Sequence, residues 1–347
     1  MRRWGAGLTG VLLGLAAPAT AATAAGPQAV CRIRDDRLTE ISGLVATRTG
    51  YVVVNDGSDD PAGRRIFFLD RRCAVTRTVG YPSRPRDTED LASAADGTLW
   101  VADIGDNRLA RTTIALWRLA PGARTPRLFR LAYPDGAHDA EALLLTRAGT
   151  PIVVTKSAAT ATLYVPAAPL SAARPTPLRR AGAVTVPVTG TSNPFSLPGR
   201  LVVTGGAVSP DGRRVVLRTY ADAFEFDVPG DDLVRALTDG TPRSVPLPDE
   251  PQGESVAYSP DGTALLTVSE VTEAGSGAEL LRYPLPNRPP ATSAPPAISA
   301  RPAASAPPAA APSTDPRRAP AVPVLVAVAL ALAAGMLGAV TLWRRRR

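Results

Sequence analysis

Charged and small polar residues recur at two fixed distances from a series of glycines, and these residues are the ones in the chain best suited to chemistry. The glycines are Gly50, Gly97, Gly149, Gly212 and Gly262. Eight residues before them stand Ser42, Glu89, Glu141, Thr204 and Glu254. Six residues after them stand Asp56, Asp103, Thr155 followed by Lys156, Arg218, and Val268 with Glu270 close behind. Carboxylate and other polar side chains that recur at equivalent positions predict a site that binds an ion or activates water.

A divalent cation is one ligand that these residues favour. The carboxylates are joined by the oxygens of Asp106 and Asn107, which follow Asp103 in the same loop. The chain has a single histidine, His138, and neither a CxxC pair nor a His-Cys cluster, so a zinc site is not expected. Oxygen-rich clusters without histidine suit Ca²⁺ or Mg²⁺. We predict Ca²⁺, with Glu89, Asp103 and Asp106 as its ligands.

Two other interpretations of the same residues stay open. Lys156 and Arg218 stand among the carboxylates, which suits an anionic ligand or a structural ring of ion pairs. Polar residues at strand starts can also serve only to hold neighbouring sheets together. Paired carboxylates could activate water, whereas His138 has no nucleophile motif around it, so a Ser-His-Asp enzyme is not expected.

The spacing of the glycines indicates the elements that position these residues. The repeats are roughly 50 residues apart, and short apolar runs flank each turn, a pattern typical of a β-propeller. Ser209-Pro-Asp-Gly212 and Ser259-Pro-Asp-Gly262 are typical of type I turns that end in a residue with positive φ. In a propeller the first strand of each blade lines a central channel, so the candidate residues should meet at one mouth of it.

Counting the apolar runs gives five blades between residues 26 and 286. The fifth blade lacks its fourth strand, and Ala29–Ile33 is a spare strand at the other end of the chain. We therefore expect the N-terminal strand to close the ring, which removes open sheet edges. The longer interval before Thr204 leaves room for an irregular sixth blade.

Two cysteines, Cys31 and Cys73, predict a single disulfide in a secreted chain. It would tie the N-terminal strand to the outer part of the first blade. A bridge of this kind requires Cα atoms within about 7 Å, although the outer strands of neighbouring blades diverge.

The two ends of the chain predict export and anchoring. Residues 1–25 have the basic start, apolar core and small residues of a signal peptide. Residues 287–318 are rich in proline, alanine and serine, which predicts a disordered stalk. Residues 319–343 carry no charge and are long enough to form a transmembrane helix. Residues 344–347 are four arginines, which favour a cytoplasmic tail and place the body outside the cell membrane.

The formal net charge of +8 is a property of the ends. Arginines of the signal, stalk and tail account for it, and residues 26–286 are close to neutral. The charge therefore gives no support for nucleic-acid binding.

Several motifs give the chain a resemblance to known proteins. Glu89-Asp-Leu-Ala, Asp103-Ile-Gly-Asp-Asn107, Asp139-Ala-Glu-Ala-Leu143, Leu217-Arg-Thr-Tyr220 and Gln252-Gly-Glu254 resemble a group of secreted actinobacterial β-propellers. More distantly, they are similar to phytase-like and esterase-like propeller proteins. The resemblance spans most of Cys31 to Pro286 and implies the fold more than an activity. Phytase-type phosphatases bind calcium through carboxylates at the channel mouth and use several basic residues around the phosphate, of which only Lys156 and Arg218 are placed here.

The sequence thus predicts a surface-anchored extracellular β-propeller that binds a ligand or protein, with a divalent cation at the channel mouth. A metal-dependent hydrolase acting on phosphate esters or lactones is one alternative. An envelope scaffold that binds through its blade faces and edges is the other.

Overall fold

The computed structural model describes residues 26–58, 60–271 and 275–286, and these form an almost entirely β structure. Its helical segments are short: α1 (Ser196–Gly199), a 3-10 turn (Pro229–Asp231) and α2 (Leu233–Asp239). Among the described residues, no helix has the length and apolar character needed to cross a bilayer. The signal peptide, stalk, transmembrane segment and tail predicted from the sequence all lie outside the described residues.

The strands follow one another as antiparallel meanders of four. The first comprises β2 (Ile41–Ala46), β3 (Gly50–Asn55), β4 (Arg65–Asp70) and β5 (Val75–Gly80). The second comprises β6 (Thr88–Ser93), β7 (Leu99–Asp103), β8 (Ile114–Leu119) and β9 (Arg127–Ala132). The third comprises β10 (Ala140–Leu145), β11 (Pro151–Thr155), β12 (Thr160–Pro166) and β13 (Thr176–Thr185). The fourth comprises β14 (Gly205–Val208), β15 (Arg214–Arg218), β16 (Asp222–Asp227) and β17 (Arg243–Pro246).

The last sheet combines both ends of the described chain. Its members are β18 (Gly253–Tyr258), β19 (Ala264–Ser269), β20 (Ala278–Pro284) and, on the outside, β1 (Gln28–Ile33). β1 pairs antiparallel with β20 along its length, as expected for an N-terminal strand that closes the ring. A disulfide joins Cys31 of β1 to Cys73, which lies in the turn between β4 and β5, and the two Cα atoms are 5.9 Å apart.

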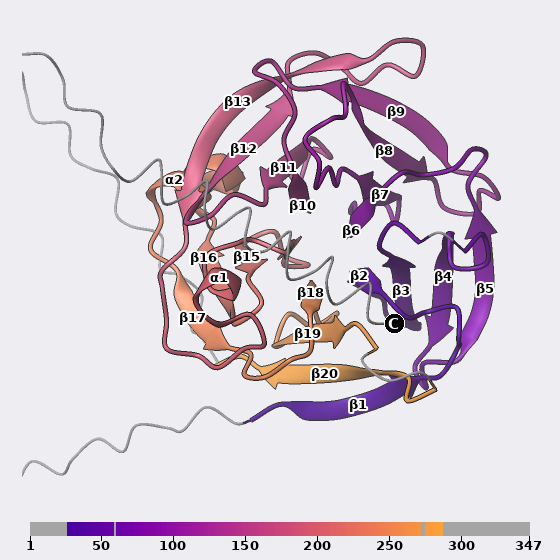
Figure 1. Ribbon diagram of the computed structural model, residues 1–347, viewed down its shortest axis with the longest axis vertical. Helices are drawn as coiled ribbons and strands as arrows, with labels where there is room; N and C mark the ends of the chain where they lie inside the picture. Colours follow the sequence, from indigo (N-terminus) through magenta and orange to yellow (C-terminus); the bar gives the residue numbers. More distant parts are fainter. Residues whose placement is uncertain (1–25, 59, 272–274, 287–347) are drawn as a thin grey trace, which may run out of the picture.

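The innermost strands form a closed ring around a central axis. β2 packs against β6, β6 against β10, β10 against β14, β14 against β18, and β18 against β2 again. Figure 1 looks down this axis and shows the first strands of the meanders at the centre and β5, β9, β13, β17 and β1 at the rim. This closed radial arrangement of sheets is that of a β-propeller.

The second and third meanders are not separate sheets. β13 pairs in parallel with β9 through Thr176 and Pro177, which joins both meanders into one sheet of eight strands. β13 is ten residues long, and its first two residues are the ones that pair with β9. Residues 186–204, which make the interval before β14 long, contain α1 and no strand.

The core lies between neighbouring sheets. The middle strands β3, β11 and β15 carry continuous apolar runs because both of their faces are covered by adjacent sheets. The turns that follow the inner strands conform to the sequence prediction: Gly212 and Gly262 have φ of 70° and 68°, and each donates its N–H to the serine that opens its turn. The inner strands are thereby held in register around the axis.

Candidate functional site

The polar residues predicted at the strand starts occupy β-bulges. The pairing of the inner strand with its neighbour shifts between Ile41 and Gly43, Thr88 and Asp90, Ala140 and Ala142, and Gly253 and Ser255. The extra residues at these four shifts are Ser42, Glu89, Glu141 and Glu254. A bulge leaves one residue without a ladder partner and turns its side chain, and it is a common device beside functional sites.

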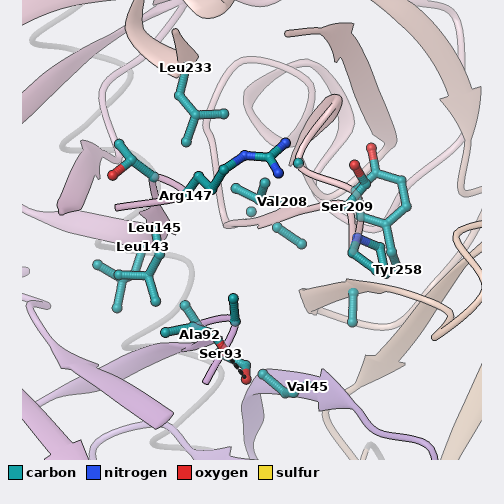
Figure 2. Close-up of a pocket in the computed structure, with 18 of the residues that line it drawn as sticks. Val45, Ala92, Ser93, Leu143, Leu145, Arg147, Val208, Ser209, Leu233 and Tyr258 are labelled. Atoms are coloured by element: carbon teal, nitrogen blue, oxygen red, sulfur yellow. Dashed lines mark hydrogen bonds between the residues drawn. The ribbon is translucent and has the colours of Figure 1, made fainter. Parts of the chain in front are cut away.

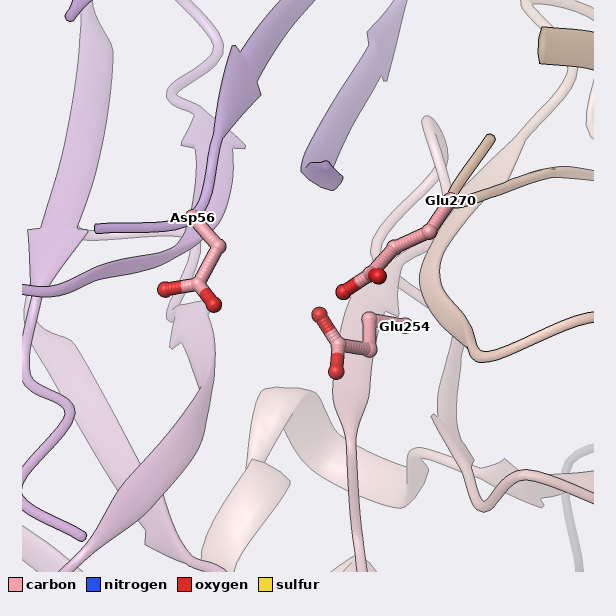
Figure 3. A group of neighbouring side chains, drawn as sticks. All are labelled: Asp56, Glu254 and Glu270. Atoms are coloured by element: carbon pink, nitrogen blue, oxygen red, sulfur yellow. The ribbon is translucent and has the colours of Figure 1, made fainter. Parts of the chain in front are cut away.

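Two groups of three carboxylates meet at this end of the channel, and both include Asp56. One group is Asp56, Glu254 and Glu270, and the other is Asp56, Asp87 and Glu89. Within each group, one oxygen from every residue lies within 4.8 Å of the others. Figure 3 shows the first group, with the three carboxylates directed toward one another from separate elements. Both groups are arranged as ligands around a single ion would be.

Burial and the repulsion between neighbouring carboxylates raise the pKa values of the carboxyl groups in this site. Burial raises the pKa of Glu89 well above its usual range, and Asp56 and Glu141 raise it further. Burial, together with the charge of Asp56 and a hydrogen bond to it, raises the pKa of Asp87 to about 8. Burial raises the pKa of Glu254 to about 7, although Lys156 opposes the shift. Ionising these carboxyl groups together requires positive charge beside them, which a bound cation would supply.

Lys156 links Glu141 to Glu254 through the hydroxyl of Tyr220. Its Nζ donates to Glu141 Oε1 and to the hydroxyl of Tyr220 at 3.2 Å, and that hydroxyl donates to Glu254 Oε1 at 3.2 Å. Burial alone would lower the pKa of Lys156, but Glu141, Tyr220 and Glu254 raise it well above the usual range. The ammonium group stays charged and balances one carboxylate of the cluster.

Two oxygens of the site are buried without a hydrogen-bond partner. They are Oε2 of Glu141 and Oε2 of Glu254, and both residues are at most 3% exposed. A buried acceptor left unsatisfied costs free energy, so such atoms usually mark a bound ion or water.

Backbone packing holds the carboxylates in place. A Cβ atom on Gly105 would lie 2.0 Å from Glu89 Oε1 and 2.6 Å from Asp87 Oδ2. A Cβ atom on Gly57 would lie 2.3 Å from Asp87 Oδ1. These glycines allow the backbone to approach closely, and the site is narrow because of it.

The sequence predicts Asp103 and Asp106 as metal ligands, but neither residue belongs to these two groups of carboxylates. Asp103 accepts hydrogen bonds from Arg111 Nη2 at 2.9 Å and from Trp117 Nε1 at 3.2 Å. It also accepts the backbone N–H of Asp87 at 3.0 Å. Asp106 accepts the backbone N–H of Arg111 at 2.8 Å. Both carboxylates are occupied by protein donors, which come from the segment before β6, from the loop after β7 and from β8.

Arg218 and Asn107, which the sequence also predicts at the channel mouth, lie apart from the clustered carboxylates. Arg218 is fully buried and donates to Glu250 Oε2 at 3.1 Å and to the carbonyl of Ser255 at 2.8 Å. It ties β15 to β18. Asn107 is an exposed residue in the turn after Asp106. Of the nine mouth residues predicted from the sequence, the structure places Asp56, Glu89, Glu141, Lys156 and Glu254 together.

Asp87 joins the site although the spacing from the glycines does not point to it, and Glu270, which stands two residues beyond the fixed offset, joins it as well. A signal for Asp87 is present in the sequence: it stands two residues before Glu89, and Asp139 stands two residues before Glu141. Burial raises the pKa of Asp139, which accepts the backbone N–H of Asp106 at 2.7 Å. Two of the repeats therefore carry a second acidic residue two positions before the glutamate of the inner strand.

The opposite end of the channel has a different lining. A cavity of about 360 Å³ opens there between the ends of the inner strands. Figure 2 shows its walls, which include Val45, Ala92, Leu143, Val208 and Tyr258, with Arg147 reaching across. Arg147 donates to the Asp211 carbonyl at 2.9 Å and to Asp231 at 3.0 Å. We call the carboxylate end the acidic mouth and this end the apolar mouth.

Comparisons with known proteins do not identify the chain. No family model and no curated protein sequence matches it. A gluconolactonase from Xanthomonas campestris is 16% identical over 67% of this chain and 68% of its own, with a TM-score of 0.38. Virginiamycin B lyase from Staphylococcus aureus is 12% identical over 76% and 75%, with a TM-score of 0.36. The β-propeller domain of Cps50 (Swd1) from Myceliophteria thermophila is 12% identical over 74% and 99%, with a TM-score of 0.39. At this level of similarity, these neighbours do not inform on ligand or activity.

Proposed function

We propose that the acidic mouth binds a divalent cation through Asp56 and that the cation holds an extracellular ligand at the channel entrance. The observation that carries the proposal is the pair of carboxylate groups that share Asp56. The unsatisfied buried oxygen of Glu254 is a second and independent sign that an ion belongs there. In this role the protein is a binding module.

The donor chemistry favours Ca²⁺. Every side chain in the two groups offers carboxylate oxygen, and Ca²⁺ takes about 6–8 oxygen ligands in a flexible geometry. His138, the one histidine, is bonded to Asp135 and Tyr164 instead. Mg²⁺ demands a more regular octahedron than carboxylates from separate elements readily supply.

A thermal-shift titration tests the cation. The full-length protein, kept in neutral detergent, should gain stability with CaCl₂ and gain less with MgCl₂, because a ligand that binds only the folded state stabilises it. The double variant Asp56→Asn, Glu254→Gln should lose the shift. Asp239→Asn removes one exposed carboxylate from α2 and should keep it. A wild-type protein that responds to none of Ca²⁺, Mg²⁺ and Mn²⁺ would refute the proposal.

A hydrolase is the second candidate, and one observation favours it. Asp87 and Glu254 hold their protons to about pH 8 and about pH 7, and both lie beside the proposed cation. A carboxyl group that titrates near neutral pH is suited to accept a proton from attacking water. Assays with phosphate esters and lactones, with and without a chelator, would separate an enzyme from a binding module. Turnover that is lost with the chelator would favour the hydrolase.

We also propose a blade count of five. The support is that five inner strands follow one another around the axis and that β13 and β9 share only two pairs of residues. Small-angle scattering of the full-length chain would test the compact ring that this count implies.

The proposed location is the outer face of the cell membrane, with residues 319–343 as the anchor. β20 ends at Pro284, which pairs with Ala264 beside the turns of the apolar mouth. The described chain therefore ends on the side of the apolar mouth. Labelling of intact cells with a membrane-impermeant reagent should reach the propeller. An envelope scaffold, the remaining alternative, predicts retention of partners after Asp56→Asn.

A further inference from the structure

A groove of about 560 Å³ lies where the two ends of the described chain meet, away from the acidic mouth. Its walls come from the turn between β2 and β3, the turn between β4 and β5, the turn between β18 and β19, and the strands β1 and β20. The side chains that give it its character are Arg48, Arg71, Arg282, Tyr51 and Asp261.

The arginines of this groove form no ion pair within the described residues. Arg71 directs Nε and Nη2 to the carbonyl of Arg48, at 3.2 and 2.6 Å. Arg282 donates Nη2 to the hydroxyl of Thr263 at 3.1 Å. These bonds orient two guanidinium groups and neutralise neither, and Arg48 lies on the exposed turn beside them.

Asp261 is the single carboxylate that lines the groove, and its oxygen is engaged within its own turn. Oδ1 accepts hydrogen bonds from the hydroxyl of Ser259 and from the N–H and hydroxyl of Thr263. These hydrogen bonds lower the pKa of Asp261 to about 2, so it stays ionised. The groove thus holds three positive charges against one negative charge.

The disulfide fixes the two sides of the groove relative to each other. Cys73 stands two residues after Arg71 in the same turn, and Cys31 follows Val30, which lines the groove. β1 is also paired to β20, the strand that carries Arg282. The bridge therefore holds the Arg71 turn against the strand pair that positions Arg282, and a ligand between them would find its partners already placed.

We propose that this groove binds a phosphate-type oxyanion through Arg48, Arg71 and Arg282. The guanidinium group is a planar fork of N–H donors that matches the oxygens of phosphate, and charge-assisted hydrogen bonds of this kind are the strong ones. The groove lies at the end of the propeller where the chain leaves, so a phosphate of the envelope or of a lipid headgroup and a free phosphate are both within its reach. The proposal does not depend on the cation at the acidic mouth.

Isothermal titration tests the groove with two probes, inorganic phosphate and glycerophosphoglycerol, a lipid headgroup without acyl chains. The full-length protein in neutral detergent is used at constant ionic strength. We expect saturable binding of at least one probe. Binding of phosphate alone indicates a free phosphate or monoester, and binding of the diester indicates a headgroup or an envelope polymer. Absence of binding for both probes overturns the proposal.

Variants separate the groove from a general effect of charge. The double variant Arg48→Gln, Arg71→Gln should weaken binding at least about tenfold, because each lost charged hydrogen bond removes a strong contact. Arg72→Gln removes an exposed arginine next to the groove that does not line it, and should leave affinity unchanged. Equal losses in the double variant and in Arg72→Gln would overturn the proposal. A cooperative thermal unfolding transition of the double variant, at a temperature close to that of the wild type, shows that it is folded.

Discussion

The two mouths of the channel are made by the same five inner strands and differ in almost every physical property. At the acidic mouth, bulges turn Glu89, Glu141 and Glu254 toward a shared space, where burial raises the pKa of each carboxyl group. At the apolar mouth, the strands continue without bulges into tight turns, and small side chains leave a cavity of about 360 Å³. The repeated strands therefore form the scaffold, and the candidate site lies where the inner strands carry bulges and where the charged residues differ from one repeat to the next.

The largest expected effect comes from a substitution that breaks a buried ion pair near the acidic mouth. Arg218→Ala should lower the free energy of unfolding by about 3–5 kcal/mol, since it leaves Glu250 buried beside no cation. Urea denaturation measures it. Arg147→Ala at the apolar mouth breaks a pair in which both side chains are more than half exposed, and should cost less than about 1 kcal/mol. Equal losses would contradict the contrast between the mouths.

The next effect concerns the repulsion among the carboxylates. Without added cation at pH 8, Glu89→Gln should stabilise the protein, because the folded state raises the pKa of Glu89 and an amide removes the cost of burying an ionisable group beside other carboxylates. The same variant should weaken the calcium shift. Thermal melts with a chelator and with CaCl₂ measure both. A variant that is less stable than wild type with the chelator would indicate that Glu89 is chiefly structural.

A smaller effect is a dependence of stability on pH. Asp87 and Glu254 keep their protons to about pH 8 and about pH 7 when folded, but release them near 3.8 and 4.5 when unfolded. Between these values the folded state binds more protons, so stability without cation should fall as the pH rises from about 5 to 8. Calcium should stabilise more at the upper end, where protons compete less. Asp87→Asn should flatten the decline, and an unchanged slope would contradict the assignment.

The smallest effect is expected from filling the apolar mouth. Ala207→Leu adds apolar volume to a half-exposed residue that lines the cavity, where the larger side chain finds open space. It should change stability by less than about 1 kcal/mol and leave the calcium shift intact. Chemical denaturation and a calcium titration of this variant check both statements. Loss of the calcium shift would mean that the two mouths are coupled.

Much of the fold could be predicted because local signals repeat. The Ser-Pro-Asp-Gly turns, the runs of short apolar strands and the spare strand at Ala29–Ile33 each specify their own geometry. The pairing of β1 with β20 and the disulfide between Cys31 and Cys73 accord with that reading. The sheet shared by β9 and β13 was not predicted, because a parallel pair of two residues leaves no mark in the sequence.

The sequence by itself determined that Glu89, Glu141 and Glu254 occupy equivalent places at the starts of inner strands, since a residue at a fixed offset from a turn recurs at the same place in each repeat. It could not determine which of the predicted mouth residues remain available to a ligand. Asp103 is occupied by Arg111 and Trp117, and Arg218 by Glu250, through contacts between residues distant in the chain. Asp87 and Glu270 reach the site for the same reason. Only the tertiary structure decides this, because a side chain's partners depend on which loops the closed ring brings together.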